Sequence, residues 1–254
     1  MRITRAVVPS LFTVLNMFCG FLSIINASRG DVLQASWLII LAAGFDALDG
    51  VMARITKSSS QFGVEIDSLS DVVSFGAAPA FLVYTVHLYT MNGVGILISS
   101  LLMVFAGLRL ARFNVNLVGY EKDHFVGLPT PASALTVAAF MIKYWSPSSG
   151  LDGVAPVLPY LVVALGLLMV SKVKYDTLPK ISRRSLEREP WKFIFLGLAI
   201  VLVFVTAGEA IFPLFILFIV LGLVRYVGSL MKHILHHEEK RKEEENAEPT
   251  SVDI

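Results

Sequence analysis

Long apolar runs alternate with short polar connections along the chain. At a rise of about 1.5 Å per residue, about 20 apolar residues cross the roughly 30 Å of hydrocarbon in a bilayer. We expect membrane helices in the apolar runs at residues 9–28, 33–54, 70–91, 94–113, 130–149, 153–172, 191–207 and 209–232. The pattern therefore predicts an all-α, polytopic integral membrane bundle of about eight transmembrane helices.

Composition supports this prediction. Hydrophobic residues make up 55% of the 254 residues, charged residues make up 16%, and mean hydropathy is +0.70. Those values lie outside the usual balance of a soluble domain. The single cysteine, Cys19, excludes an intramolecular disulfide and is expected in the core. We expect a transmembrane domain at 1–232, followed at 233–254 by a charged, disordered cytoplasmic tail.

The basic residues are distributed very unevenly between the connections. If the N-terminus and every even-numbered connection lie on one side, that side holds all of the 21 lysines and arginines except Arg29 and Lys143. The positive-inside rule then predicts that both termini, and the connection between the second and third helices, are cytoplasmic. A formal net charge of +1 gives no reason to expect a nucleic-acid partner.

Four aspartates interrupt the apolar pattern around that connection. One face of the second helix, about 140° wide at about 100° per residue, carries Asp46, Asp49, Gly50, Ala53 and Arg54. On the third helix Asp67 and Asp71 are four residues apart and share a face. Carboxylates at membrane depth are costly and usually mark a site. Antiparallel packing of the two helices is expected to bring all four acids together near the membrane boundary.

Gathered carboxylates repel one another unless cations lie among them. Arg54 and Lys57 are the basic residues nearby, and they are too few for four acids. One or two divalent ions, bound by carboxylate oxygens, provide the missing charge. The small residues Gly50 and Ala53 on this helical face leave a groove, and the planar guanidinium of Arg54 suits phosphate oxygens. These residues together predict Mg²⁺ or Mn²⁺ holding a phosphoryl ester, whereas simple hydrogen bonding between helices is the structural alternative.

The acidic segment also carries a family resemblance. Residues 46–71 read D-x2-D-G-x2-A-R-x8-G-x3-D-x3-D, which resembles without departure the signature of the CDP-alcohol phosphatidyltransferase family. Supporting stretches are VPSLFTVLNMFCGFLSI in the first helix, RLARFNV ending the fourth, GLPTPASA entering the fifth and LMVSKVKY leaving the sixth. The two prolines of GLPTP also predict a rigid turn and a helix start. The resemblance extends from residue 8 to about 180 and is strongest to members whose acceptor alcohol is serine.

The resemblance implies a reaction and a role for each matching residue. Members bind a CDP-linked lipid and two divalent metals, here Mg²⁺ or Mn²⁺, and the hydroxyl of a second substrate displaces CMP. The implied metal ligands are Asp46, Asp49, Asp67 and Asp71, of which Asp71 is also the implied general base. Contacts to the CDP-lipid are implied for Asn16, Gly50, Ala53, Arg54, Ser60 and Gly63. The implied substrates are CDP-diacylglycerol and L-serine, and a homodimer is expected because members commonly pair through membrane helices.

The acceptor is the least constrained part of the prediction. Serine carries a carboxylate, so a cation is expected near the metals. Arg109 and Arg112, three residues apart at the end of the fourth helix, are the candidates, with Arg112 preferred and Asn114 as a polar neighbour. Lys172 and Lys174 are a second candidate pair, and interfacial anchoring is the ordinary alternative for all these cations. Glycerol 3-phosphate or inositol phosphate would need the same cations, so they stay open as acceptors.

Two other classes of membrane protein use aspartates in helical bundles. Intramembrane prenyltransferases need a second aspartate-rich motif, whereas Asp123, Asp152 and Asp176 are isolated here. A divalent-cation transporter would usually show repeated halves, and the acidic segment has no second copy. We expect a phosphatidyltransferase and keep the transporter as the alternative from another class.

Overall fold

The computed structural model describes residues 7–56, 61–118, 127–173, 175, 197–198 and 201–247. This part of the chain is built from helices and contains no β-sheet. In chain order, the elements are α1 (Val7–Ser28), α2 (Val32–Thr56), α3 (Gln61–Asp71), the π-helix η1 (Val72–Ala77), α4 (Ala78–Val86), the 3₁₀ turn η2 (Leu88–Met91), α5 (Asn92–Val118), α6 (Thr130–Tyr144), α7 (Val157–Val170) and α10 (Ile211–Ala247).

Within these described ranges, five helical segments are long and apolar enough to cross a membrane. They are Leu11–Ser28, Val32–Met52, Phe62–Val86, Leu88–Val115 and Ile211–Lys232. The prediction of an all-α polytopic membrane protein is thus confirmed. The helices near the predicted spans 130–149 and 153–172 are shorter than expected, with 15 residues in α6 and 14 in α7. Of the predicted span 191–207, residues 191–196, 199 and 200 lie outside the described residues.

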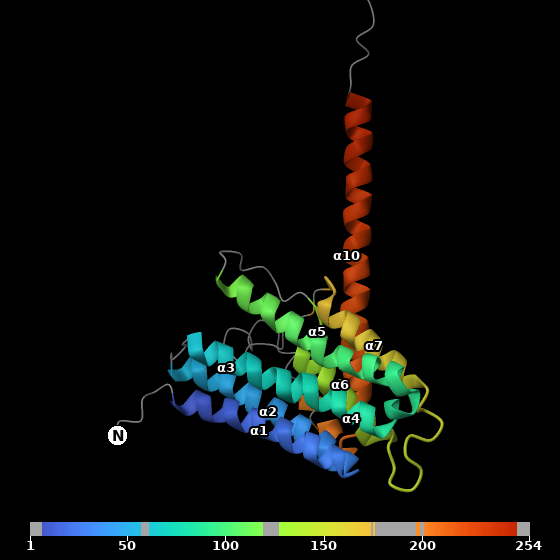
Figure 1. The fold of residues 1–254 in the computed structure, drawn as a ribbon. Coiled ribbons are helices and arrows are strands. Elements are labelled where there is room, and N and C mark those ends of the chain that lie inside the picture. Colours follow the sequence, from blue (N-terminus) through green and yellow to red (C-terminus); the bar gives the residue numbers. More distant parts are fainter. Residues whose placement is uncertain are drawn as a thin grey trace, which may run out of the picture.

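The first helices form the layer that carries the acids. A tight turn at Gly30, with φ of +85°, joins α1 and α2 into a hairpin. The third helix begins at Gln61, earlier than the predicted residue 70, and α3, η1 and α4 run on as one rod. This rod lies beside α1 (Figure 1), and α1 contacts α3, η1 and α4 as well as α2. The acidic end of α2 and the acidic end of the rod therefore share one neighbour, α1.

Small residues dominate the contacts between these helices. The fully buried alanines are Ala35, Ala42, Ala78, Ala106, Ala134, Ala138 and Ala139. In a bilayer, lipid is as apolar as leucine, so helices associate by close packing, which small side chains permit. One close approach is between α1 and η1, where a Cβ on Gly20 would lie 2.6 Å from the Cα of Ser74. The predicted core residue Cys19 is buried and free next to this contact.

Further along the chain, α5 packs on η1, α4 and α7, and α6 packs on α2, η1 and α10. The predicted turn before α6 is present: Gly127 has φ of +92°, and its N–H donates to the Val173 carbonyl at 2.9 Å. A Cβ there would lie 3.0 Å from the backbone carbon of Met169, so glycine is required. This turn fastens the start of α6 to the end of α7.

The C-terminal helix α10 is 37 residues long and extends far beyond the other helices (Figure 1). Residues 233–247, which the sequence assigns to a disordered tail, continue this helix. Their run of glutamate and lysine explains the difference, because both are good helix formers even without a buried face. At its other end α10 packs on the segment after α7, where Gly222 lies against the ring of Tyr175. Burial raises the pKa of Tyr175 to about 12, so this phenol stays neutral.

Candidate metal centre

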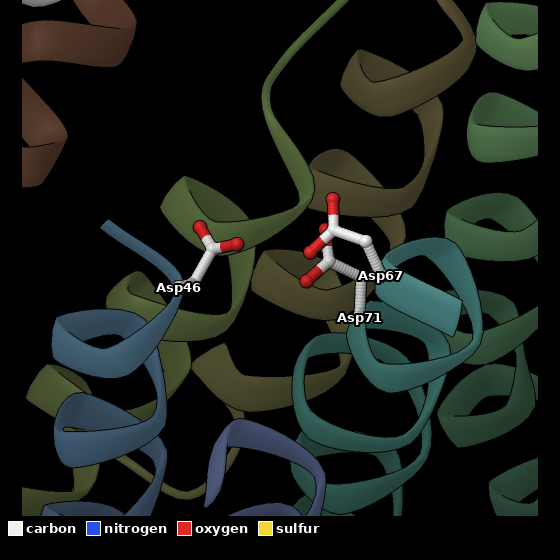
Figure 2. Close-up of side chains that lie close together, drawn as sticks. All are labelled: Asp46, Asp67 and Asp71. Carbon is white, nitrogen blue, oxygen red and sulfur yellow. The ribbon is translucent and has the colours of Figure 1, made fainter. Parts of the chain in front are cut away.

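Three of the four predicted carboxylates converge where α2 meets α3. Asp46 comes from α2, and Asp67 and Asp71 come from the last turns of α3 (Figure 2). One carboxylate oxygen from each lies within 4.8 Å of those of the other two. Asp71 is buried, and the other two are half-buried. Hard carboxylate oxygens at this spacing suit a divalent cation such as Mg²⁺ or Mn²⁺, so the donor set fits the predicted ions.

The fourth carboxylate, Asp49, lies outside this group of three. It is 8% exposed, and one of its oxygens accepts a hydrogen bond from the hydroxyl of Thr13 on α1. Its other oxygen is buried without a hydrogen-bond partner. Asp49 still interacts electrostatically with Asp46 and Asp67. An orphaned, buried carboxylate oxygen beside three other acids is where a cation would be bound.

Helix α1 holds both halves of the site, a role that the sequence indicated only through Asn16. Asn16 is fully buried and donates from Nδ2 to Asp71 at 3.3 Å, while its Oδ1 has no partner. Thr13, three residues earlier on the same face, reaches Asp49. The sequence did contain a sign of this role: Thr13 and Asn16 are polar, lie three residues apart in an apolar run, and so share a helical face. The single helix α1 thus fixes one acid of α2 and one acid of α3.

Two serines of the rod strengthen this connection. The Ser70 hydroxyl donates to the Thr13 carbonyl at 3.0 Å, and the Ser74 hydroxyl donates to the Asn16 carbonyl at 2.8 Å. Both serines are fully buried. Because they lie one turn apart across the end of α3, they fasten the rod to α1 on both sides of Asp71. The backbone carbonyls of Thr13 and Asn16 therefore set the position of Asp71, and sequence patterns alone do not reveal such bonds.

The α-helical winding changes directly after Asp71. Residues Val72–Ala77 form a π-helix with Ser74, Phe75 and Gly76 buried. Short π segments are rare and often lie at functional sites, since the wider turn re-aims the side chains around it. Here the π-helix lies between the acidic end of the rod and the apolar α4. The direction of Asp67 and Asp71 therefore does not depend directly on how α4 packs.

The two predicted acceptor-binding arginines have different surroundings. Arg109 interacts electrostatically with Asp71, and its Nη1 donates to Thr130 Oγ1 at 3.5 Å. Its Nε is buried without a partner. Arg112, which the sequence analysis preferred, is exposed and donates to the Val170 carbonyl at 3.5 Å. Of the two arginines, Arg109 is therefore the one that is half-buried and interacts with an acid of the centre, whereas Arg112 is exposed.

The structure describes the other predicted site residues to different extents. Gly50 is exposed, and a Cβ added to it would meet no atom within 4 Å, consistent with the expected groove. Gly63 lies in the first turn of α3. Asn114 is bonded to Ser68 of α3 at 2.9 Å, and Lys172 is exposed. Ser60 and Lys174 lie outside the described residues, as do the side chains of Ala53 and Arg54.

The fold and the site together define a class: a helical membrane protein in which carboxylates of neighbouring helices form a centre suited to divalent cations. The chain also matches the family model described as CDP-alcohol phosphatidyltransferase over residues 6–170. That match spans α1 to α7 and includes every residue of the centre. The chain belongs to the CDP-alcohol phosphatidyltransferase family.

Similar proteins of established name are found in bacteria and archaea. The chain is 34% identical over 235 residues to a CDP-diacylglycerol–serine O-phosphatidyltransferase of Helicobacter pylori, covering 90% of this chain and 94% of that protein. It is 31% identical to the Bacillus subtilis protein of the same name, over 72% of this chain and 98% of that one. It is 38% identical to an archaetidylserine synthase of Methanothermobacter thermautotrophicus, over 66% of this chain and 68% of that one.

Proposed function

We propose that the protein transfers the phosphatidyl group of CDP-diacylglycerol to the hydroxyl of L-serine, giving phosphatidylserine and CMP. The observation that carries this proposal is the convergence of Asp46, Asp67 and Asp71 within the region of the family match. Serine is favoured as the acceptor because three relatives are named for serine transfer. The distribution of lysine and arginine supports a site at the cytoplasmic face, where serine and CMP are soluble.

In this proposal the four acids hold two divalent ions, Mg²⁺ or Mn²⁺. Asp46, Asp67 and Asp71 supply converging oxygens, and Asp49 supplies its orphaned oxygen. When bound, such ions neutralise the diphosphate and the departing CMP oxygen. Asn16 and Gly50 lie where the CDP group would approach, Gly50 because its surroundings are open and Asn16 because its buried Oδ1 lacks a partner. Arg54, Ala53, Ser60 and Gly63 complete the proposed lipid-nucleotide contacts.

Asp71 is the proposed general base. The serine hydroxyl attacks the phosphorus that carries diacylglycerol, and its proton passes to the Asp71 carboxylate. A new P–O bond to serine forms while the P–O bond to CMP breaks, and the bridging oxygen leaves with CMP. Asn16 donates to one oxygen of Asp71, which keeps the carboxylate in a fixed orientation. Positioning and charge neutralisation are the main requirements of this reaction, and both are properties of this centre.

The test uses the purified protein in mixed micelles with labelled CDP-diacylglycerol and Mg²⁺ or Mn²⁺. Serine, glycerol 3-phosphate and inositol phosphate are supplied separately, and CMP release and lipid products are measured. We expect release with serine and none after chelation of the metal. Direct attack also requires that no CMP appears without an acceptor. Release with another alcohol alone would retain the family activity and refute the choice of serine.

A divalent-cation transporter is the alternative from another class, because carboxylates also line cation pathways. Cation flux into liposomes without any CMP release would favour it.

The expected homodimer is a separate prediction. Cross-linking in native membranes, followed by denaturing electrophoresis, should give a band of twice the monomer mass. Its absence would contradict the dimer without affecting the proposed reaction.

A further inference from the structure

Two buried polar groups, one on α5 and one on α6, have no part in the reaction steps described above. The Ser133 hydroxyl on α6 is fully buried and has no hydrogen-bond partner. The Arg109 Nε is also buried without a partner. Both groups can donate, and a buried donor without an acceptor is destabilising. An acceptor that is absent from the protein itself would satisfy both.

Ser133 differs from other serines and threonines in the described helices. Hydroxyls at such positions usually bond to a carbonyl one turn back. Ser36 donates to the Val32 carbonyl at 2.8 Å, and Thr136 donates to the Ala132 carbonyl at 2.7 Å. Thr136 is on the same helix as Ser133 and is equally buried, so burial in α6 does not prevent this bond. Ser133 therefore lacks this bond because of where it lies in α6, and not because it is buried.

That location is the first turn of α6. Thr130, which accepts the bond from Arg109, is three residues before Ser133, so the two share a helical face. The helix start carries no side-chain cap at Pro129. A helix N-terminus favours negative charge through its free N–H groups and its dipole. Helix α6 contacts both α2, which carries Asp46, and η1, which directly follows Asp71.

We infer that Arg109, Ser133 and the start of α6 bind the carboxylate of an amino-acid acceptor, which makes Ser133 a specificity-determining residue. This inference rests on the proposed function, because it assigns the acceptor's carboxylate within the same site. A carboxylate accepts hydrogen bonds from a guanidinium and from a hydroxyl, and the charge-assisted ones are strong. Arg109 interacts electrostatically with Asp71, so binding of the acceptor's carboxylate by Arg109 would direct the hydroxyl of a small amino acid toward the proposed base.

The test compares serine with serine methyl ester, which keeps the hydroxyl and ammonium but lacks the charged carboxylate. CMP release is measured in micelles containing CDP-diacylglycerol and metal. For the unaltered protein we expect kcat/KM for serine to exceed that for the ester by about 100-fold or more, because polar groups built for a substrate reject an analogue that lacks the matching group. Ser133→Ala should raise KM for serine about tenfold and reduce the preference over the ester by a similar factor.

Thr136→Val is the matched control, because it also removes a buried hydroxyl from α6, but one already bonded within the helix. We expect it to leave the serine preference unchanged, and both variants to keep KM for CDP-diacylglycerol within about twofold. An unchanged KM for serine in Ser133→Ala overturns the inference. If that variant does not fold, equal use of serine and ester by the unaltered protein overturns it. If serine gives no phosphatidylserine at all, the proposed serine transfer itself is refuted, and the pocket with it.

Discussion

The bond between Thr13 and Asp49 gives a quantitative test of how α1 controls the metal centre. Thr13→Val keeps the shape of the side chain and removes the hydroxyl that donates to Asp49. Asp49 is only 8% exposed and its second oxygen already lacks a hydrogen-bond partner in the protein, so no other protein group replaces the lost bond. Neutral side-chain pairs in membrane proteins average about 0.6 kcal/mol. A hydrogen bond to a charged group contributes about 1.5–3 kcal/mol.

We take about 1.5–2 kcal/mol, because Asp49 is ionised when it binds a metal. At 1.4 kcal/mol per factor of ten, this predicts that half-maximal CMP release needs about 10- to 30-fold more Mg²⁺ or Mn²⁺. The assay is CMP release against metal concentration, with unfolding in detergent measured at each concentration. At saturating metal we expect most of the activity to return, since the acids that converge are unchanged.

Thr136→Val is again the appropriate control, since it removes a buried hydroxyl whose bond is internal to its helix. Its metal dependence should match that of the unaltered protein. If Thr13→Val shows the same metal requirement as the control, then Thr13 does not orient Asp49 for metal binding. The reasoning would also fail if the variant lost activity equally at every metal concentration, because the bond would then act on another step.

Three further substitutions test separate parts of the site. Asp71→Asn keeps the acceptor oxygen for Asn16 but removes the base, so turnover should fall at least about 1,000-fold while CDP-diacylglycerol binding, measured by equilibrium dialysis in micelles, changes little; near-normal turnover would refute the assignment. Gly20→Ala places a methyl group 2.6 Å from the Cα of Ser74 and should lower stability in detergent by about 2 kcal/mol or more; an unchanged unfolding temperature would contradict the tight contact. Gly50→Ala meets open space, so stability should be unchanged, whereas KM for CDP-diacylglycerol should rise about tenfold if the lipid nucleotide lies against it.

Much of the fold follows from hydrophobicity alone, because the bilayer requires long helices whose backbone groups are satisfied internally. The helices α1, α2, α5 and α10 correspond to predicted runs at 9–28, 33–54, 94–113 and 209–232. The start of the third helix was not predicted well. Its first turns, from Gln61 to Asp67, mix apolar residues with glutamate and aspartate, so the apolar run by itself did not show where the helix begins.

At the candidate site, spacing identified which acids could meet. Asp67 and Asp71 share a face by their spacing of four, and the structure brings both to Asp46. Spacing could not show that Asp49 faces Thr13, because that depends on how α1 packs against α2. Nor could it favour Arg109 over Arg112. Both lie on one helical face, and their difference is set by α6 and α7, which are distant in sequence.

The π-helix after Asp71 has a consequence for how this chain can change through insertion and deletion. An α-helix turns by about 100° per residue, so deleting one residue from Val72–Ala77 can restore ordinary winding without breaking the rod. The residue removed is the extra one that the wider turn takes up, so the acids upstream would keep nearly the same direction relative to the apolar half. Almost any other single-residue loss in a membrane helix would instead expose its polar face to lipid. The carboxylates can therefore still meet after this short stretch loses one residue, whereas a loss from the α-helical turns on either side would rotate them by about 100°.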